Sequence, residues 1–228
     1  MKCAVVIPAA GSGLRFGSET PKQYLPLRGR PLIAYAVEKF LGQECVEQLI
    51  ICASDVYHPT LRDMIREFSW RDVTLVEGGL SRQHSVHNGV RAAAEECQMV
   101  AIHDAVRPFF AADTFRSVLA AAASCGAALP VRSINETVHE VIGGKIEQTI
   151  DRDRLRAAQT PQCFRRRILL EALERAIRDG FVGTDEASLV AHYGHEVRAV
   201  EGDSMNLKIT RPEDLRCAEA NFELWSRP

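Results

Sequence analysis

Short, largely apolar runs alternate with segments of helical periodicity over the first 125 residues, and this alternation restricts the possible folds most. Four such runs lie at 3–7, 49–53, 73–76 and 99–102, and each suits a strand covered on both faces. Apolar residues recur with helical spacing at 32–41, 61–68, 85–97 and 114–125. Strands that alternate with helices of this length predict right-handed βαβ units in an α/β fold. We therefore expect a mostly parallel twisted sheet flanked by helices.

The pattern changes around residue 130. Residues 136–141 and 145–150 predict a β-hairpin, because Gly143 and Gly144 supply the positive φ of a tight turn. The hairpin carries charges and no obvious apolar face, so it needs another surface to lie against. Further helices are expected at 165–178 and 185–192, and further strands at 196–200 and 206–209. We expect one domain over residues 1–228, with a hairpin arm inserted at 133–155.

A last helix is predicted at the end of the chain. Thr210-Arg211-Pro212-Glu213 fits a capping box, in which a hydroxyl and a carboxylate satisfy the first backbone N–H groups of a helix. Helical spacing then places four apolar residues on one face: Leu215, Ala218, Phe222 and Trp225.

The charge and the cysteines exclude several classes of protein. A formal net charge of −2 gives no basic excess for binding nucleic acid or an anionic membrane. No apolar run approaches the roughly 20 residues that a membrane span requires. The seven cysteines are scattered and form no C-x-x-C pair, which argues against a disulfide framework and a structural zinc site. We expect reduced thiols in a cytoplasmic protein that binds neither nucleic acid nor membrane.

The strongest local signal follows the first predicted strand, where Pro8-Ala9-Ala10-Gly11-Ser12-Gly13-Leu14-Arg15 precedes Pro21-Lys22-Gln23. Small residues let backbone N–H groups approach an anion, and this loop lies at the ligand-binding edge of such sheets. A dinucleotide-binding fingerprint does not fit, because Gly17 falls one position late, and the Gly-Lys-Ser/Thr of a P-loop is missing. Two cations, Arg15 and Lys22, favour a polyphosphate ligand; a plain βα turn is the alternative.

Two further loops follow predicted strands. In His103-Asp104-Ala105-Val106-Arg107-Pro108, Asp104 could accept polyol hydroxyls or ligate Mg²⁺, and Arg107 could clamp a phosphate. The alternative is that the two side chains simply pair and cap the strand end. Gly78 and Gly79 precede a predicted helix whose N-terminus could cradle a base or ribose. Ser85, taken alone, is interpreted as the N-cap of that helix.

Metal-based and covalent catalysis have little support. His84 and His87 lie three residues apart, as do His192 and His195, but neither pair has a third ligand nearby in the sequence. The chain lacks a Gly-x-Ser-x-Gly nucleophile motif, and none of its cysteines stands out as a nucleophile.

The ordered set of these segments resembles the 2-C-methyl-D-erythritol 4-phosphate cytidylyltransferase family over essentially the full chain. Each motif is weak alone, and the set in this order is specific. It comprises Pro8-Ala9-Ala10-Gly11-x-Gly13-x-Arg15, Pro21-Lys22-Gln23-Tyr24, Gly78-Gly79-x-x-Arg82-x-x-Ser85-Val86, His103-Asp104-Ala105-x-Arg107-Pro108, Asp151-Arg152, Thr160-Pro161-Gln162, Thr184-Asp185-Glu186-Ala187 and Asn206-x-Lys208-x-Thr210-x-Pro212-Glu213-Asp214.

The resemblance implies a nucleotide-diphospho-sugar-transferase-like, Rossmann-like fold, in a homodimer whose hairpins embrace the partner and whose active sites are shared. It implies transfer of CMP from CTP to a polyol phosphate, with Mg²⁺ held mainly by the CTP phosphates. The implied catalytic residues are Arg15, Lys22, Arg152 and Lys208. The implied CTP-binding residues are Pro8, Ala9, Ala10, Gly11, Ser12, Gly13, Gly79, Ser85, Asp104 and Ala105. The implied acceptor-binding residues are Asp104, Arg107, Thr137 and Thr160.

The main rival is ribitol 5-phosphate cytidylyltransferase, which shares the CTP chemistry and takes an unbranched polyol. More distant alternatives are a hexose-1-phosphate nucleotidyltransferase and a nonenzymatic nucleotide sensor; a sensor would not need its cations together. Three departures from the family pattern concern the charged segments. Leu14 stands where a second basic residue is common, His84 where an acidic or polar residue is common, and Asp153-Arg154 extends the charged segment after Arg152.

Overall fold

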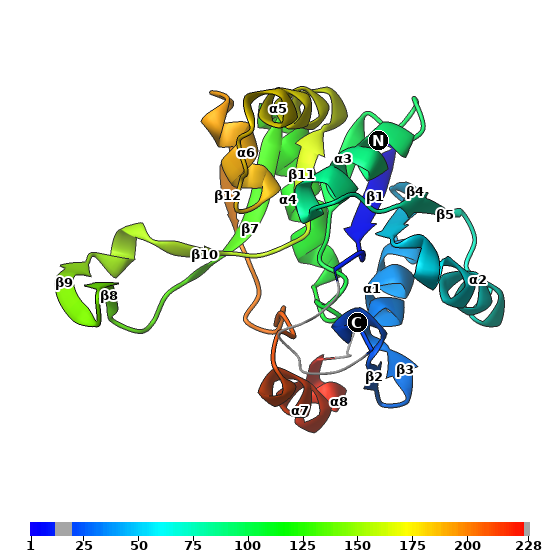
Figure 1. Ribbon diagram of the computed structural model, residues 1–228, viewed down its shortest axis with the longest axis horizontal. Helices are drawn as coiled ribbons and strands as arrows, with labels where there is room; N and C mark the ends of the chain where they lie inside the picture. Colours follow the sequence, from blue (N-terminus) through cyan, green and yellow to red (C-terminus); the bar gives the residue numbers. More distant parts are fainter. Residues whose placement is uncertain (12–19, 226–228) are drawn as a thin grey trace.

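The computed structural model describes residues 1–11 and 20–225, and its main sheet is mostly parallel (Figure 1). The strand order is β10-β7-β11-β6-β1-β4-β5, with β12 beside β7. The pairs of β1 with β4 and β6, of β4 with β5 and of β7 with β12 are parallel, whereas β10 and β11 run antiparallel to their neighbours. The strand bounds are β1 Cys3–Pro8, β4 Val46–Ala53, β5 Val73–Glu77, β6 Met99–Ile102, β7 Ala127–Ser133, β10 Arg156–Ala158, β11 Gln162–Arg165 and β12 Arg198–Glu201. The predicted fold class is confirmed.

Helices cover both faces of this sheet. On one face lie α1 (Leu32–Leu41), α2 (His58–Glu67) and α4 (Ala112–Cys125). On the other lie α3 (Arg82–Ala92), α5 (Arg166–Asp179) and α6 (Glu186–His192). The chain ends with α7 (Pro212–Ala220) and α8 (Phe222–Trp225), below the sheet in Figure 1 beside the short pair β2 (Pro26–Leu27) and β3 (Arg30–Pro31). Short 3₁₀ turns lie at Lys22–Tyr24, Asp55–Tyr57 and Arg152–Arg154.

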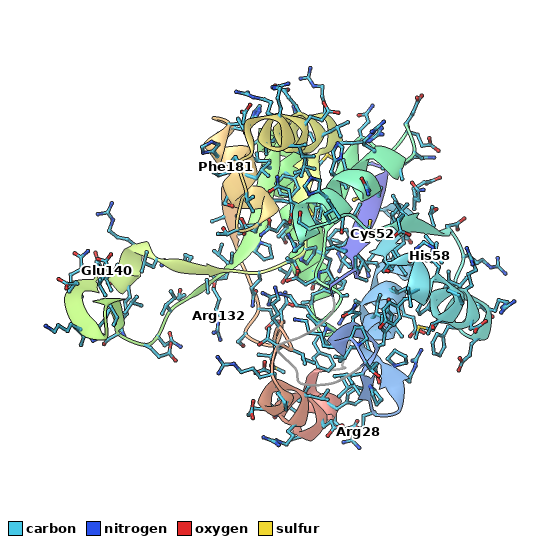
Figure 2. All side chains as sticks on the ribbon, in the orientation of Figure 1. Arg28, Cys52, His58, Arg132, Glu140 and Phe181 are labelled. Atoms are coloured by element: carbon cyan, nitrogen blue, oxygen red, sulfur yellow. The ribbon has the colours of Figure 1, made fainter. Side chains whose placement is uncertain are left out.

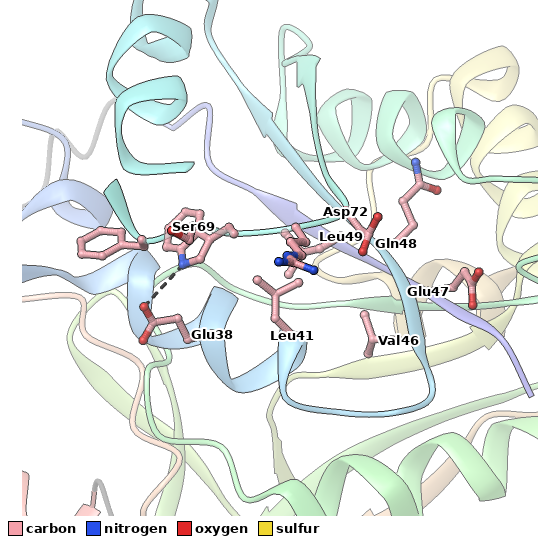
Figure 3. A pocket seen from close by; sticks show the side chains of 11 residues that line it. Glu38, Leu41, Val46, Glu47, Gln48, Leu49, Ser69 and Asp72 are labelled. Atoms are coloured by element: carbon pink, nitrogen blue, oxygen red, sulfur yellow. Dashed lines mark hydrogen bonds between the residues drawn. The ribbon is translucent and has the colours of Figure 1, made fainter. Parts of the chain in front are cut away.

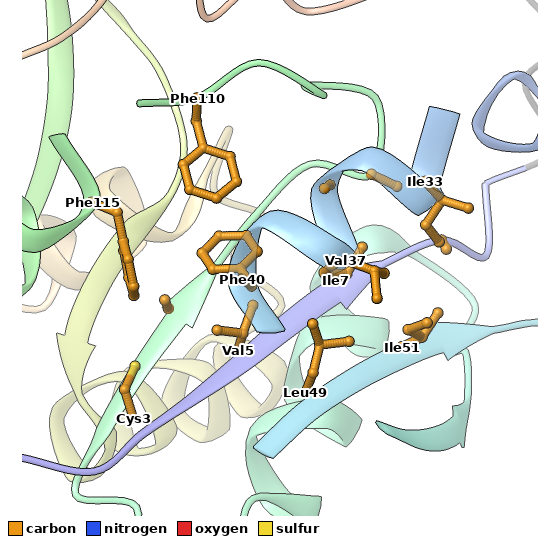
Figure 4. Close-up of a cluster of buried hydrophobic side chains, with 14 of the residues drawn as sticks. Cys3, Val5, Ile7, Ile33, Val37, Phe40, Leu49, Ile51, Phe110 and Phe115 are labelled. Carbon is orange, nitrogen blue, oxygen red and sulfur yellow. The ribbon is translucent and has the colours of Figure 1, made fainter. Parts of the chain in front are cut away.

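The first strand divides its side chains between two cores. Successive residues of a strand point to opposite faces, so Val5 joins the cluster under α1 and α4, while Val6 joins the cluster under α3 and α5. The first cluster is shown in Figure 4, where Phe40 of α1 stacks on Phe110 with ring centroids 4.3 Å apart. Burial on both faces explains why the strand is continuously apolar. The same packing holds the carboxyl end of β1 in place, where the first loop begins.

Several sequence-based expectations were wrong or incomplete. The strands β7, β10 and β11 were not predicted, although β7 and β11 lie inside the sheet. Residues 206–209 form no strand, because Asn206 bonds to other loops and Ile209 N–H bonds singly to Val106 O at 2.9 Å. The last helix breaks at Asn221, whose backbone N–H bonds back to Cys217 O at 3.1 Å. Its N-terminus is capped by Asp214, not Glu213, since Asp214 Oδ2 accepts from Thr210 N–H at 2.8 Å.

The hairpin arm extends away from the body, with Arg132 near its root and Glu140 at its far end (Figures 1 and 2). Its strands are β8 (Val138–Ile142) and β9 (Lys145–Ile150), and both turn glycines have the predicted positive φ, 57° and 81°. An apolar face was not expected, but a register shift after Glu140 sets Val141 opposite Ile146. These two side chains are 56% and 62% exposed, so the arm presents an apolar pair that nothing within the described chain covers.

Candidate active site

A pocket of about 790 Å³ opens at the carboxyl ends of the parallel strands, where open α/β sheets hold their ligands. Three loops that follow β1, β5 and β6 form most of its wall, and the segment after β12 completes it. The lining residues are Pro8, Ala9, Ala10, Gly11, Lys22, Gln23, Gly79, Leu80, Ser81, Arg82, Ser85, Asp104, Ala105, Val106, Lys208 and Thr210. The three loops singled out in the sequence therefore meet in one cavity.

The loop after β1 is tied to the segment that carries Lys22. Ala9 N–H donates to Cys52 O of β4 at 2.7 Å, which extends the sheet by one bond. Gln23 is buried, and its Nε2 donates to Ala9 O at 2.6 Å and to Gly11 O at 3.1 Å. These bonds explain how Lys22, beside Gln23, comes to line the pocket. Ser12, Gly13 and Arg15 lie outside the described residues.

Ser85 closes the loop after β5 with two hydrogen bonds and is not the N-cap of α3. Ser81 is the N-cap of α3, since its Oγ accepts from His84 N–H at 3.2 Å. Ser85 lies one turn inside the helix, where its Oγ accepts from Gly79 N–H at 3.0 Å and donates to Ser81 O at 2.9 Å. The interpretation of Ser85 as the N-cap was therefore wrong. A Cβ on Gly79 would lie 2.3 Å from His84 Cβ, so this tight turn requires glycine.

Close packing brings α3 to the pocket. A Cβ on Gly89 would lie 2.5 Å from Val6 Cγ1 and 2.7 Å from Cys52 Sγ, so glycine lets the helix rest directly on β1 and β4. This contact sets the N-terminus of α3, with Arg82, against the edge of the sheet where β1 and β6 end. Arg82 belongs to one of the motifs found in the sequence, but no role was predicted for its side chain.

Asp104 is the centre of charge in the pocket. Its Oδ2 lies 2.9 Å from Lys208 Nζ and 3.4 Å from Arg107 Nε, and its Oδ1 lies 3.4 Å from Arg82 Nη2. Burial alone would raise the pKa of Asp104, but the charges of Arg82, Lys208 and Arg107 outweigh burial and hold the pKa well below its usual value. Asp104 is therefore ionised throughout the neutral range and gathers three cations.

A directional chain of hydrogen bonds supports Asp104 from behind. Asp104 N–H donates to Thr160 Oγ1 at 3.1 Å, and the Thr160 hydroxyl donates to His103 Nδ1, 3.0 Å away, because the other ring nitrogen of His103 faces a carbonyl oxygen and must carry the ring proton. His103 Nε2 then carries the ring proton and donates to Arg107 O at 3.0 Å. Burial is the largest effect on His103 and lowers its pKa to about 4, so the ring is neutral. Thr160 can offer a ligand a lone pair but no proton.

Arg107 and Asn206 join this wall to the segment before Lys208. Arg107 Nη1 donates to Asn206 O at 2.7 Å, and Asn206 Nδ2 donates to Thr160 O at 2.7 Å. Arg107 Nη2 also reaches Ala158 O at 3.5 Å. A guanidinium has five N–H donors, so two remain after these bonds and the bond to Asp104. Arg107 therefore pairs with Asp104, as the alternative interpretation predicted, and neither Arg107 nor Thr160 is among the residues that line the pocket.

Two of the expected site residues lie away from this pocket, in the arm. Arg152 begins a short 3₁₀ turn at the end of the hairpin, and its guanidinium bonds to Asn135 O. Thr137 is exposed just before β8. Neither lines the pocket of its own chain.

The described residues contain no group of three or more His, Cys, Asp or Glu side chains suited to a metal ion. His84 Nδ1 lies 2.8 Å from Ser81 Oγ, and the His192 ring stacks on Phe181 at 3.8 Å. Of the described residues that line the pocket, Asp104 alone carries a carboxylate.

A second pocket, of about 480 Å³, lies between the end of α1 and the amino ends of β4 and β5 (Figure 3). Trp70 Nε1 donates to Glu38 Oε1 at 3.4 Å across it. None of the three loops singled out in the sequence contributes to its lining. No helix in the described part of the chain combines the length and apolar character that crossing a membrane requires.

Comparison with known proteins gives consistent matches over nearly the whole chain. The family model described as 2-C-methyl-D-erythritol 4-phosphate cytidylyltransferase matches residues 3–223. Proteins of that name from Solibacter usitatus and Geobacillus kaustophilus are each 39% identical and cover 96% of this chain, which spans 94% and 96% of their lengths. The crystal structure of the Thermus thermophilus enzyme of that name superimposes with a TM-score of 0.81 at 33% identity, covering 96% of this chain and 98% of that one.

Proposed function

Because the chain belongs to the 2-C-methyl-D-erythritol 4-phosphate cytidylyltransferase family, we propose that it transfers CMP from CTP to 2-C-methyl-D-erythritol 4-phosphate in non-mevalonate isoprenoid biosynthesis. The observation that carries this proposal is the pocket at the ligand edge of the sheet, which Lys22 lines and in which Arg82 and Lys208 pair with Asp104. Cations that converge there suit a polyphosphate, and a buried carboxylate suits the hydroxyls of a polyol.

The chemistry needs positioned cations more than proton transfer. An oxygen of the acceptor phosphate attacks the α-phosphorus of CTP, and the bond from that phosphorus to the bridging oxygen breaks, so its electron pair leaves with pyrophosphate. Negative charge grows on the transferred group and on pyrophosphate, where preorganised cations stabilise it. The acceptor phosphate is already ionised at neutral pH, so no general base is required. The absence of an obvious base among the proposed site residues agrees with this scheme.

Most of the residues proposed to bind CTP line the pocket, whereas Thr137 and Arg152 come from the arm. Residues 8–13 wrap the CTP phosphates, with Gly79, Ser85, Asp104 and Ala105 towards the nucleoside. Arg15 and Lys22 stabilise the transition state. Lys208 keeps one of its three ammonium protons on Asp104, 2.9 Å away, and turns the others to the phosphates. Asp104, Arg107, Thr137 and Thr160 bind the acceptor, and Arg152 joins Lys208 in holding its phosphate.

A divalent cation, Mg²⁺ by preference, is proposed as the cofactor. Both oxygens of Asp104 already face cations, so this carboxylate alone makes a poor metal site. We therefore propose that the CTP phosphates hold most of the ion's coordination shell, with Asp104 as its one candidate ligand from the pocket. The ion would neutralise charge on the triphosphate.

A homodimer with shared sites is the proposed assembly. Arg152 and Thr137 lie in the arm outside their own chain's pocket, and the exposed Val141–Ile146 pair offers an apolar contact for a second copy. Both observations support an arm that reaches the neighbouring subunit. All seven cysteines are free thiols, which supports a cytoplasmic location for the enzyme.

One assay tests the proposed function. Pyrophosphate release is measured with CTP, UTP, ATP and GTP against two acceptors, 2-C-methyl-D-erythritol 4-phosphate and ribitol 5-phosphate, with Mg²⁺ or excess EDTA. We expect rapid release with CTP, the branched acceptor and Mg²⁺ only. Preference for ribitol 5-phosphate would establish the alternative acceptor, and equal rates with UTP or ATP would contradict the proposed CTP selectivity.

A further inference from the structure

A buried acidic side chain behind the pocket has no part in the scheme above. Glu186 is the first residue of α6, and its side chain is 3% exposed, whereas its partner Arg82 is 37% exposed because it lines the pocket. Arg82 Nη1 donates to Glu186 Oε1 at 2.6 Å, and Arg82 Nη2 donates to Asp104 Oδ1 at 3.4 Å. One guanidinium therefore joins a carboxylate behind the wall to the carboxylate at the centre of the site.

Stability alone gives a poor account of Glu186. Its second oxygen, Oε2, is buried and has no hydrogen-bond partner in the described part of the chain. Buried ion pairs often stabilise a protein no more than apolar residues of the same volume, and a half-satisfied carboxylate is worse than a fully bonded one. A buried carboxylate that depends on a single cation therefore calls for another explanation.

The geometry of Arg82 supplies that explanation. A guanidinium is a rigid planar fork, so the short bond of one amine to Glu186 fixes the direction of the other amine. The contact with Asp104 is longer by comparison. Charge favours the same arrangement, because Arg82 pairs with Glu186 as well as with Asp104, which Arg107 and Lys208 also contact. Without Glu186, Asp104 would be the one carboxylate paired with Arg82, and the guanidinium would move closer to it.

We propose that Glu186 is a positioning residue of the acceptor site, which draws Arg82 back so that Asp104 Oδ1 remains open to a hydroxyl of the polyol phosphate. Glu186 does not line the pocket and acts through Arg82 alone. The inference rests on the proposed function, since it takes Asp104 as a ligand of the acceptor.

The test begins with Glu186→Gln, which keeps the shape and one acceptor oxygen but removes the charge. Arg82 then closes on Asp104, and we expect kcat/KM for the acceptor to fall by roughly 10- to 100-fold, mostly through KM, as for a misplaced binding group. The urea midpoint should stay close to that of the wild type. Glu171→Gln is the matched control: Glu171 on α5 faces Arg175 at 4.0 Å on the surface, and its loss should leave kcat/KM within about twofold.

A double variant separates positioning from structure. Arg82→Gln leaves Glu186 buried without a partner and should destabilise the protein, and adding Glu186→Gln should restore its stability by removing that charge. Because no guanidinium is then left to close on Asp104 Oδ1, a positioning pair predicts restored folding and an acceptor KM nearer to the wild type than that of Glu186→Gln alone. A double variant that folds but keeps the raised acceptor KM of Glu186→Gln would overturn the proposal, as would Glu186→Gln with an acceptor KM within twofold of wild type.

Comparison with the wild type separates the role of Glu186 from the identity of the acceptor. Ratios of variant to wild type are measured with whichever of the two polyol phosphates the wild type uses. The wild-type rates alone decide the acceptor, and the ratios alone decide the role of Glu186.

Discussion

The wall of the pocket and the hairpin arm hold their polar residues in opposite ways. In the wall, Asp104, Thr160 and Asn206 are buried and are fixed by bonds from segments far apart in the same chain. In the arm, Arg152 follows β9 and bonds to Asn135 O in the segment before β8, and the Val141–Ile146 pair is exposed. The hydrogen bonds that fix the wall are therefore all made within one subunit. The apolar pair of the arm can be buried only against another surface.

The largest effect is expected in the wall, at Lys208. Replacing Lys208 by Ala removes a cation that sits 2.9 Å from Asp104, and kcat should fall by roughly 10²–10³, as for the loss of one preorganised stabiliser. Lys2 makes a contact of the same length, 2.9 Å to Glu47, but on the surface, so Lys2→Ala is the matched control and should leave kcat unchanged. Steady-state kinetics of both variants measure the contrast. A Lys208 variant with normal kcat and a raised KM would indicate substrate binding alone.

The second prediction concerns the arm, and it asks whether Arg152 acts in the neighbouring site. Lys22→Ala and Arg152→Ala proteins are each expected to be nearly inactive. Mixed in equal amounts with subunits free to exchange, about half of the dimers should be hybrids. If Arg152 acts in the neighbouring site, each hybrid has one site with both lesions and one with neither, so about a quarter of all sites recover. No recovery despite demonstrated exchange would return Arg152 to its own subunit.

Features that depend on neighbouring residues could be predicted from the sequence, whereas contacts between distant segments could not. Strands such as β1 and β6 were found because burial on both faces makes them continuously apolar. Strand β7 was missed because a proline, Pro130, argues against a strand. The strand tolerates Pro130 because this residue lies between the stretch that pairs with β11 and the stretch that pairs with β10. The three loops around the pocket were predicted from their glycines and charges. The bond of Arg82 to Glu186 was not, because its partners lie 104 residues apart and only the fold brings them together.

The third prediction uses pH to probe the wall. The folded protein holds His103 neutral with a pKa of about 4, against an ordinary value near 6.5, so the unfolded chain binds more protons between these values. Stability is therefore full above pH 6.5 and is lost as the pH falls towards 4, by about 3 kcal/mol in total. Asp104 titrates below this window. Urea unfolding of the wild type and of His103→Asn at several pH values measures the effect, and the variant should show the shallower slope. Equal slopes would mean that His103 does not stay neutral in the fold.

The smallest effect, on the free energy of unfolding of the subunit, is expected when the apolar pair of the arm is replaced. Val141→Ser with Ile146→Ser removes two exposed side chains that contribute nothing to the cores under the helices, so the free energy of unfolding of the subunit should change by less than about 0.5 kcal/mol. The proposed dimer should nevertheless weaken, because these two side chains would be buried only between subunits. Urea unfolding at low protein concentration reports the first quantity, and sedimentation over a range of concentrations reports the second. A control change on the body, Val56→Ser, removes a valine that is 73% exposed, more than either residue of the pair, and should alter neither. A double variant that dimerises like the wild type would show that the pair is not part of the interface, and the arm would then have to meet its partner through its charged residues.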